Sequence, residues 1–252
     1  MKTKMKMSEV SKYEDSIIAF FKFSPYIDSL IEGNLYMNNL QHYIDQEKKT
    51  GDRGQGDKLE ASQVFSEIEF KMYDQETGEL AFTGTSESMN LRIDGDEKKP
   101  VFCIFALTSD NLSMVEETDE FYITEMNFND EEVEKMINEF GDQLAIIDPK
   151  NFIERVEKAF SEKGYGYVMS KVNYDDYTVN NTKRLGSYRK NNNEIFFWKD
   201  KYFENQNEYR FVITSIETDE PITVNIGDIS DITTKYSAKE LFSGKLQIHL
   251  RK

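Results

Sequence analysis

The sequence has few of the residues that build covalent links and transition-metal sites. Its 252 residues include 1 Cys, 2 His and 4 Pro. A single cysteine excludes an internal disulfide and fits a reducing cytoplasm, and this set of residues is too small for a structural zinc site. No run of about 20 apolar residues occurs, so we expect no membrane span. The polar start of the chain lacks an apolar segment, so we also expect no secretory signal and a cytoplasmic location.

Basic residues are in the minority, and the imbalance is local. The net charge is -16, and residues 61–163 hold 25 acidic against 9 basic side chains. The segment from Asp110 to Asp142 has 12 acidic residues and a single lysine. Such a surface repels phosphates, so we expect no direct binding of nucleic acid. Two interpretations stay open: a solvated surface, or an acidic surface that imitates nucleic acid and binds a protein that handles it.

The apolar pattern predicts many strands and a few short helices. Residues 17–23 and 101–107 are continuous apolar runs, typical of strands buried on both faces. Residues 64–73 alternate with a period of two, and a turn and a returning strand follow. The other predicted strands are 35–37, 89–93, 165–172, 194–198, 209–213, 222–226 and 246–250. The predicted helices are 26–31, 38–46, 129–140, 149–163 and 238–242.

These elements are not in the strand–helix–strand order of a parallel sheet. We therefore predict an α+β fold with mostly antiparallel sheets and four or five short helices. The sequence has no internal repeat and no linker, which favours a single domain over residues 1–252. The acidic stretch around 110–163 resembles an insert in that domain.

Common nucleotide-binding and nucleophile motifs are absent. The glycines of residues 51–56 lie in a polar segment without the strand-to-helix context of a phosphate loop, and no Gly-x-Ser-x-Gly elbow occurs. Cys103 lies in the most apolar run, where burial makes a thiol unreactive. We interpret His42 and His249 as surface or packing residues.

Acidic residues near the glycine-containing segment are the best candidates for metal ligands. Asp52, Asp57 and Glu60 carry the carboxylate oxygens that Mg²⁺ prefers. No second acidic cluster accompanies them on a neighbouring strand. We therefore interpret them as an acidic loop and predict no metal site.

The most informative segment is residues 196–213, where polar residues lead into an apolar strand. Glu204, Gln206 and Glu208 recur with a period of two, so we expect them on one face of a strand. Arg210 shares that face one step further in. Charges are seldom buried without a partner or a purpose, so a structural Glu–Arg pair and a functional carboxylate both stay open.

This segment and three other short motifs resemble a broad bacterial and phage family of unknown function. The motifs are the Gly-x-Leu-Tyr step at 33–36, the Asp-x-x-Glu at 57–60, the apolar strand 101–108 and the Glu-Tyr-Arg strand at 208–210. The layout is in turn similar to that of ADP-ribosyltransferases, in which NAD lies in a cleft between two small antiparallel sheets. The resemblance therefore implies split sheets and NAD as the cofactor.

In those enzymes a late strand begins with Gln-x-Glu or Glu-x-Glu, whose last residue is catalytic. The resemblance implies Glu208 as the catalytic carboxylate and Gln206 as the group that orients the acceptor. Lys22 stands where a first strand supplies an Arg or His, and Thr108 is the nearest substitute for a Ser-Thr-Ser motif. The NAD contacts that the resemblance implies are Lys22, Tyr36, Thr108 and Arg210.

The sequence leaves two functions open. The first is an NAD-dependent ADP-ribosyltransferase or NAD glycohydrolase, of bacterial or phage origin, that acts on an unknown acceptor. The second is a non-catalytic phage or prophage protein that inhibits a host defence or nucleic-acid-handling protein through an acidic surface. The residues that would bind this partner are Glu116, Glu117, Asp119 and Glu120.

Overall fold

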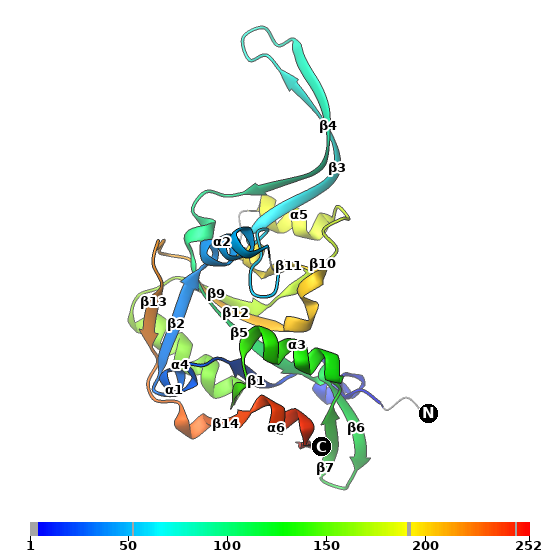
Figure 1. Ribbon diagram of the computed structural model, residues 1–252, viewed down its shortest axis with the longest axis vertical. Helices are drawn as coiled ribbons and strands as arrows, with labels where there is room; N and C mark the ends of the chain where they lie inside the picture. Colours follow the sequence, from blue (N-terminus) through cyan, green and yellow to red (C-terminus); the bar gives the residue numbers. More distant parts are fainter. Residues whose placement is uncertain (1–4, 52, 191–192, 245) are drawn as a thin grey trace.

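A computed structural model describes residues 5–51, 53–190, 193–244 and 246–252, and it has an α+β fold (Figure 1). The largest sheet has eight strands. They are β1 (Ile17–Phe23), β2 (Asn34–Asn39), β5 (Pro100–Thr108), β8 (Gln143–Ile147), β9 (Tyr167–Lys171), β12 (Glu208–Ile213), β13 (Ile222–Asn225) and β14 (Thr233–Ser237).

This sheet is forked at its central strand, β5. One edge of β5 pairs with β12 along residues 101–105. The opposite edge is shared: β1 pairs with residues 105–108 and β2 with residues 100–101. Beyond the fork, β8 and β14 extend the branch of β1, and β13 extends the branch of β2. The two branches therefore separate at the middle of β5.

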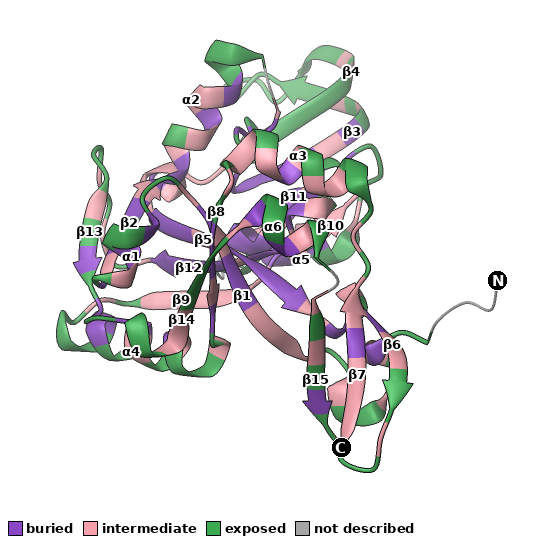
Figure 2. Cartoon of the chain, turned by 60° about the horizontal axis from the view of Figure 1, so that its bottom comes forward, coloured by how far each residue is buried: buried purple, intermediate pink, exposed green. Residues whose placement is uncertain are grey.

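Both faces of this sheet are covered, because its inner strands are apolar on both faces (Figure 2). One face packs against α1 (Ile27–Ile31) and α4 (Pro149–Glu162). The other packs against α3 (Asp130–Phe140) and α6 (Ala238–Ser243). Successive residues of β1 alternate between the two cores, with Phe20 in the first and Phe21 in the second, as the period of a strand requires.

A third apolar cluster lies beside the branch of β2. It joins α2 (Leu40–Thr50) to a 3-10 helix, η5 (Asn193–Phe197). β11 (Trp198–Asp200) begins directly after η5 in the chain and pairs in parallel with β10 (Asn173–Asp175). The remaining helices are α5 (Thr182–Arg189), η1 (Met7–Glu9), η2 (Ser11–Tyr13), η3 (Asp96–Lys98), η4 (Ser109–Asn111), η6 (Lys201–Gln206) and η7 (Ser230–Ile232).

Two smaller antiparallel sheets project from the body (Figure 1). The long hairpin of β3 (Ser62–Tyr73) and β4 (Leu80–Arg92) extends from one end. A three-stranded sheet lies at the other end. It consists of β6 (Leu112–Glu117), β7 (Phe121–Met126) and β15 (Gln247–Arg251).

The α+β class and the mostly antiparallel pairing are confirmed. The described residues contain six α-helices, α1 to α6, more than the four or five predicted. The helix that the sequence does not reveal is α5, because its mostly polar residues show no apolar periodicity. Within the acidic stretch 110–163, β8 and α4 belong to the main sheet and its core.

The prediction of a strand at residues 194–198 is wrong. These residues form η5, and a strand begins only at Trp198. Ile195, Phe196 and Phe197 are all buried. A strand would turn every second side chain away from the core, whereas this tight turn directs all three into the third cluster.

Candidate functional site

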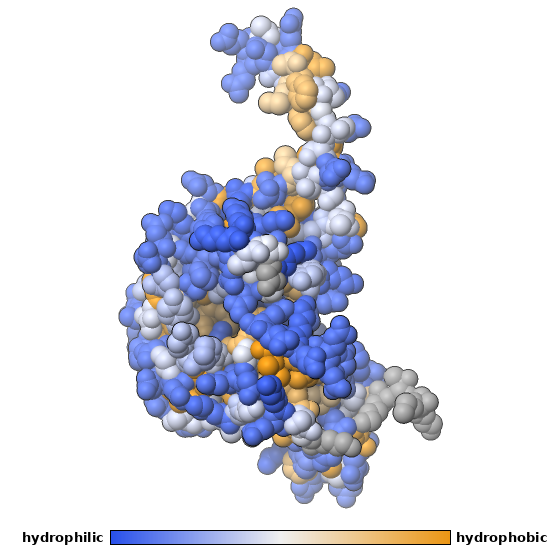
Figure 3. Space-filling model, viewed as in Figure 1, coloured by the Kyte–Doolittle hydropathy of each residue, from blue (hydrophilic) through white to orange (hydrophobic). Residues whose placement is uncertain are grey.

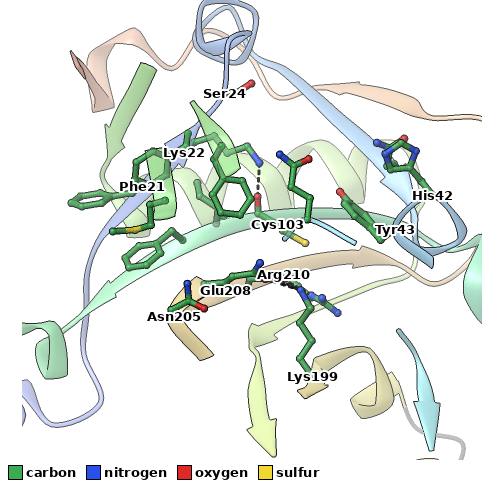
Figure 4. Close-up of a pocket in the computed structure, with 18 of the residues that line it drawn as sticks. Phe21, Lys22, Ser24, His42, Tyr43, Cys103, Lys199, Asn205, Glu208 and Arg210 are labelled. Carbon is green, nitrogen blue, oxygen red and sulfur yellow. Dashed lines mark hydrogen bonds and ion pairs between the residues drawn. The ribbon is translucent and has the colours of Figure 1, made fainter. Parts of the chain in front are cut away.

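A cavity of about 450 Å³ lies at the fork of the main sheet (Figure 4). Residues of β5 and β12 line it, together with residues of the branch strands β1 and β2, the helices α2 and α3, η6, β11 and two loops. The charged side chains around it are Lys22, Glu60, Lys199, Glu208 and Arg210. The fold therefore brings together residues from separate segments of the chain at this point.

Lys22 follows the last residue of β1 that pairs with β5. Its Nζ donates to the Cys103 carbonyl oxygen at 2.7 Å and lies 4.6 Å from the centroid of the Phe102 ring. Cys103 lies between the segments of β5 that pair with β1 and with β2. Lys22 thus supplies a hydrogen bond to β5 between the residues that pair with β1 and those that pair with β2.

Among the cations that line the cavity, Lys22 is the one that forms no ion pair with a carboxylate, as far as the described residues show. An ammonium has three N–H donors, and the described protein accepts one of them. Burial lowers the pKa of Lys22, because a charged amine loses hydration there. This ammonium therefore favours an anionic ligand in the cavity.

Arg210 is 1% exposed, and it is the centre of a buried ionic network. Its Nη1 and Nη2 donate to the two carboxylate oxygens of Glu60 at 2.8 and 2.6 Å. Its Nε donates to Oε2 of Glu208 at 2.8 Å, and Nη1 also reaches the Phe196 carbonyl at 2.8 Å. The guanidinium therefore ties the segment before β3 to β12 and η5 with a planar, two-point ion pair.

Lys199 completes this network from β11. Its Nζ donates to Oε1 of Glu208 at 2.6 Å and to Oε1 of Gln206 at 2.7 Å. The Gln206 amide nitrogen donates in turn to the Gly54 carbonyl at 2.8 Å. Both ends of the Gln206 amide are therefore occupied by the protein, and this side chain positions Lys199.

Glu208 and Arg210 share a face of β12, as their spacing predicts. The same argument fails for Glu204 and Gln206, because both lie in η6 and not in a strand. Asn207 separates the two elements with φ +40°, a left-handed conformation that asparagine tolerates better than most residues. Gln206 and Glu208 lie close together because both accept a hydrogen bond from Lys199, and not because they share a face of one strand.

The two carboxylates and two cations of this network balance in charge. Burial alone would raise the pKa of Glu208, but Arg210 and Lys199 outweigh it and hold the pKa well below its usual value. Glu208 is therefore ionised at neutral pH. About 10% of its side chain stays exposed, and each of its oxygens receives one donor. Glu208 lines the cavity, and each carboxylate oxygen can accept a further hydrogen bond.

Asp57 lies next to this network and is 1% exposed. Its Oδ1 accepts from the Leu59 amide at 2.8 Å, while its Oδ2 has no hydrogen-bond partner among the described residues. Burial, and then the negative charge of Glu60, raise its pKa from 3.8 to about 7. This segment is a loop, as we expected, but its acidic residues Asp57 and Glu60 are buried.

The remaining cavity wall is largely aromatic and apolar. Phe21 and Phe23 of β1 face Met136 and Phe140 of α3. Tyr43 of α2 stays neutral, because burial raises its pKa well above 10.0. A flat ring with a polar edge fits such a wall.

Cys103 and His42 both line the cavity, and Cys103 is half-buried there, less buried than its apolar run predicts. Burial raises the pKa of the Cys103 thiol to about 12, so it is protonated and unreactive at neutral pH. His249 lies in β15 with its ring 6.0 Å from that of Phe121. His42 is exposed but lines the cavity beside Tyr43 (Figure 4).

The structure brings together four of the six residues that the resemblance implies for catalysis and NAD binding. Lys22, Gln206, Glu208 and Arg210 line the cavity. The other two do not. Tyr36 points to solvent from β2 and is 56% exposed. Thr108 bonds Asn111 at the end of β5.

The four acidic residues proposed for partner binding lie together on the hairpin of β6 and β7. All four are exposed, at the end of β6 and in the turn that leads to β7. Glu117 pairs with Lys252 at 2.8 Å. The residues are Glu116, Glu117, Asp119 and Glu120.

Two members of the network escape sequence reasoning in different ways. Lys199 looks like a surface lysine, and its burial comes from η5 and η6, whose turns the sequence does not reveal. The sequence marks Glu60 as a candidate metal ligand and as part of the Asp-x-x-Glu motif, but not as the partner of Arg210, which lies 150 residues away. Asp52, the third candidate metal ligand, lies outside the described residues. Among those described, no cluster of three or more possible ligands occurs.

The comparisons with known proteins add no family. No family model, no curated protein and no solved structure matches this chain. Among the described helices, none has the length and apolar character needed to cross a bilayer.

The buried carboxyl of Asp57 predicts a stability that depends on pH. Because its pKa is higher in the folded chain than in the unfolded one, the free energy of unfolding falls as pH rises from about 4 to about 7. A shift from 3.8 to about 7 corresponds to roughly 4 kcal/mol. Urea unfolding of wild type and Asp57→Asn at about pH 5 and about pH 8 measures this contribution. The variant should lose less stability at the higher pH, and parallel losses in both proteins would refute the assignment.

Proposed function

We propose that the chain cleaves the nicotinamide–ribose bond of NAD at the fork cavity and transfers ADP-ribose to water or to a macromolecular acceptor. The observation that carries this proposal is the carboxylate of Glu208. It is ionised, fixed by Arg210 and Lys199, and partly exposed to the cavity. It also begins a late strand, as the catalytic glutamate of ADP-ribosyltransferases does.

The cavity is suited in size and lining to part of a dinucleotide. Its volume of about 450 Å³ lies within the usual range for small-molecule sites. The aromatic side chains of β1 and α3 offer contacts to the nicotinamide ring. Lys22, with donors to spare, offers charge to the pyrophosphate.

The chemistry requires little from the protein beyond fixed charge. When the bond from ribose C1′ to the pyridinium nitrogen breaks, its electron pair goes to nicotinamide, which leaves as a neutral molecule. The ribosyl carbon becomes an oxocarbenium-like cation, which the Glu208 carboxylate stabilises electrostatically. A hydroxyl of water or of the acceptor then bonds to C1′ and releases its proton. Arg210, Lys199 and Gln206 act as positioning residues, because they touch Glu208 or each other.

Nicotinamide release from NAD tests the role of Glu208. We expect purified protein, alone or with cell lysate as a source of acceptors, to release nicotinamide, and Glu208→Gln to be slower by about 100-fold or more. A matched control is Asp175→Asn, which removes the carboxylate partner of the fully buried Arg184 outside the cavity. It should lower stability but not the rate per folded molecule. Full activity in Glu208→Gln, or no release under either condition, would refute the proposal.

The unpaired ammonium of Lys22 predicts a preference for ligands that carry phosphate. In Lys22→Met, which keeps the apolar stem, we expect the KM for NAD to rise about tenfold. Nicotinamide riboside lacks phosphate and serves as the matched ligand. Leaving the Cys103 carbonyl unsatisfied would affect both ligands equally. The ratio of the two KM values therefore measures the contribution of the Lys22 charge. Equal weakening of both ligands would exclude a phosphate contact by Lys22.

A second candidate function is protein binding through the β6–β7 hairpin, which the clustering of four exposed carboxylates at one end of the molecule favours. Its partner would be a basic protein that handles nucleic acid. Neutralising Glu116, Glu117, Asp119 and Glu120 together to their amides should abolish capture of such a protein at low salt, and added salt should weaken capture by the wild type. Capture that survives both changes would exclude this function.

A further inference from the structure

The hairpin of β3 and β4 is an arm that leaves the body of the molecule (Figure 1). Its base is fixed to the loop before α5: Ser66 Oγ donates to the Tyr177 carbonyl at 2.8 Å, and Asn180 bonds both the amide and the carbonyl of Ser66. Arg184 donates to the Val64 carbonyl at 3.2 Å. At Glu67, where φ is +51°, the pairing is interrupted without a change of register, and the arm projects from this base beyond it.

One face of the projecting part is apolar. Cross-strand pairing places Met72 opposite Phe82, and Phe70 opposite Gly84. The rings of Phe70 and Phe82 lie 5.8 Å apart, and both cover Gly84, where an added Cβ would come within 2.8 Å of each. The face is therefore a specific arrangement of aromatic rings over glycine. Figure 3 shows the apolar band below a hydrophilic tip.

This apolar face contributes no core to the fold. Met72 is 57% exposed, Leu80 54% and Phe82 54%. A hairpin of two strands is at best marginally stable in water without a packed face. The turn at its tip is nevertheless well formed, with the Asp74 amide bonded to the Glu79 carbonyl at 2.8 Å. Contiguous exposed apolar groups on an ordered element are typical of an interaction site.

The charges beside the apolar face select the kind of partner. Between residues 67 and 87 the chain has six acidic residues, and its one basic residue is Lys71. A second copy of the arm would bring like charges together, and nucleic acid or an anionic membrane would be repelled for the same reason. A protein surface with an apolar recess and a rim of Lys and Arg has the complementary charge.

We infer that the β3–β4 arm is a docking element for a basic protein, whose apolar recess receives Phe70, Met72 and Phe82 while its rim pairs with the acidic residues of the arm. This role goes beyond the cavity and does not depend on NAD cleavage. An arm of this kind serves an enzyme by holding a macromolecular acceptor, and it serves a binding protein directly.

A displayed library of random peptides tests the inference even though the partner is unidentified. The library is selected on the immobilised full-length chain, after removal of peptides that bind the double variant Phe70→Ser, Phe82→Ser. One enriched peptide is then synthesised and titrated against both proteins. We expect enriched sequences that combine Lys or Arg with aromatic or aliphatic residues, an affinity at least tenfold lower for the double variant, and weaker binding at higher salt.

The control is Tyr236→Ser, which removes an exposed aromatic side chain from β14, at the opposite end of the body from the arm (Figure 1). It should leave peptide affinity unchanged. Circular dichroism should show both variants folded, because the substituted side chains lie outside the buried core. Absence of enrichment, enrichment of neutral or acidic peptides, or equal affinity of the double variant would overturn the inference. So would dimers of the wild type that the double variant abolishes in sedimentation.

Discussion

The two-point ion pair between Arg210 and Glu60 is the interaction on which the site depends. It links the segment that enters the β3–β4 arm to the strand that lines the cavity. Both residues are almost fully buried, so removing either charge would leave the buried network with a net charge, at a cost of about 3–5 kcal/mol. Glu208 and Lys199 can be buried nearby because the four charges balance.

The fork in the main sheet gives this network a cavity to act on. If β1 and β2 continued along β5 without separation, their side chains and backbone would fill the space that Lys22 spans. The separation leaves a cation on one side of the cavity and an ionised carboxylate, Glu208, on another. A ligand with anionic phosphates and a sugar carbon that becomes cationic has the complementary charges.

The sequence predicts the parts of this structure that depend on local patterns. The continuous apolar run of 101–107 marks the central strand, and the spacing of Glu208 and Arg210 places both on one face of β12. Residues 130–140 and 149–162 form helices close to the predicted bounds, and Asn129 and Asp148 cap them. Their side chains and capping groups lie close together in the chain, so local physics suffices.

The sequence does not predict the parts that depend on distant contacts. The pairing of Arg210 with Glu60 joins residues far apart in the chain, and Lys199 joins the same network through Glu60 and Glu208. The resemblance implies Tyr36 as an NAD contact, but Tyr36 faces solvent. Side chains of a strand alternate between its two faces, and in β2 the neighbours Leu35 and Met37 are the buried ones. The fork itself follows from how β1 and β2 divide one edge of β5, which no residue pattern records.

The most direct test of the central claim is a crystal structure with carba-NAD, in which a methylene group replaces the ribose ring oxygen and prevents cleavage. The account predicts that the nicotinamide riboside half occupies the cavity at the fork, with its C1′ carbon against the Glu208 carboxylate and its pyrophosphate near Lys22. Density for the ligand outside this cavity, or a cavity that stays empty at saturating ligand, would contradict it.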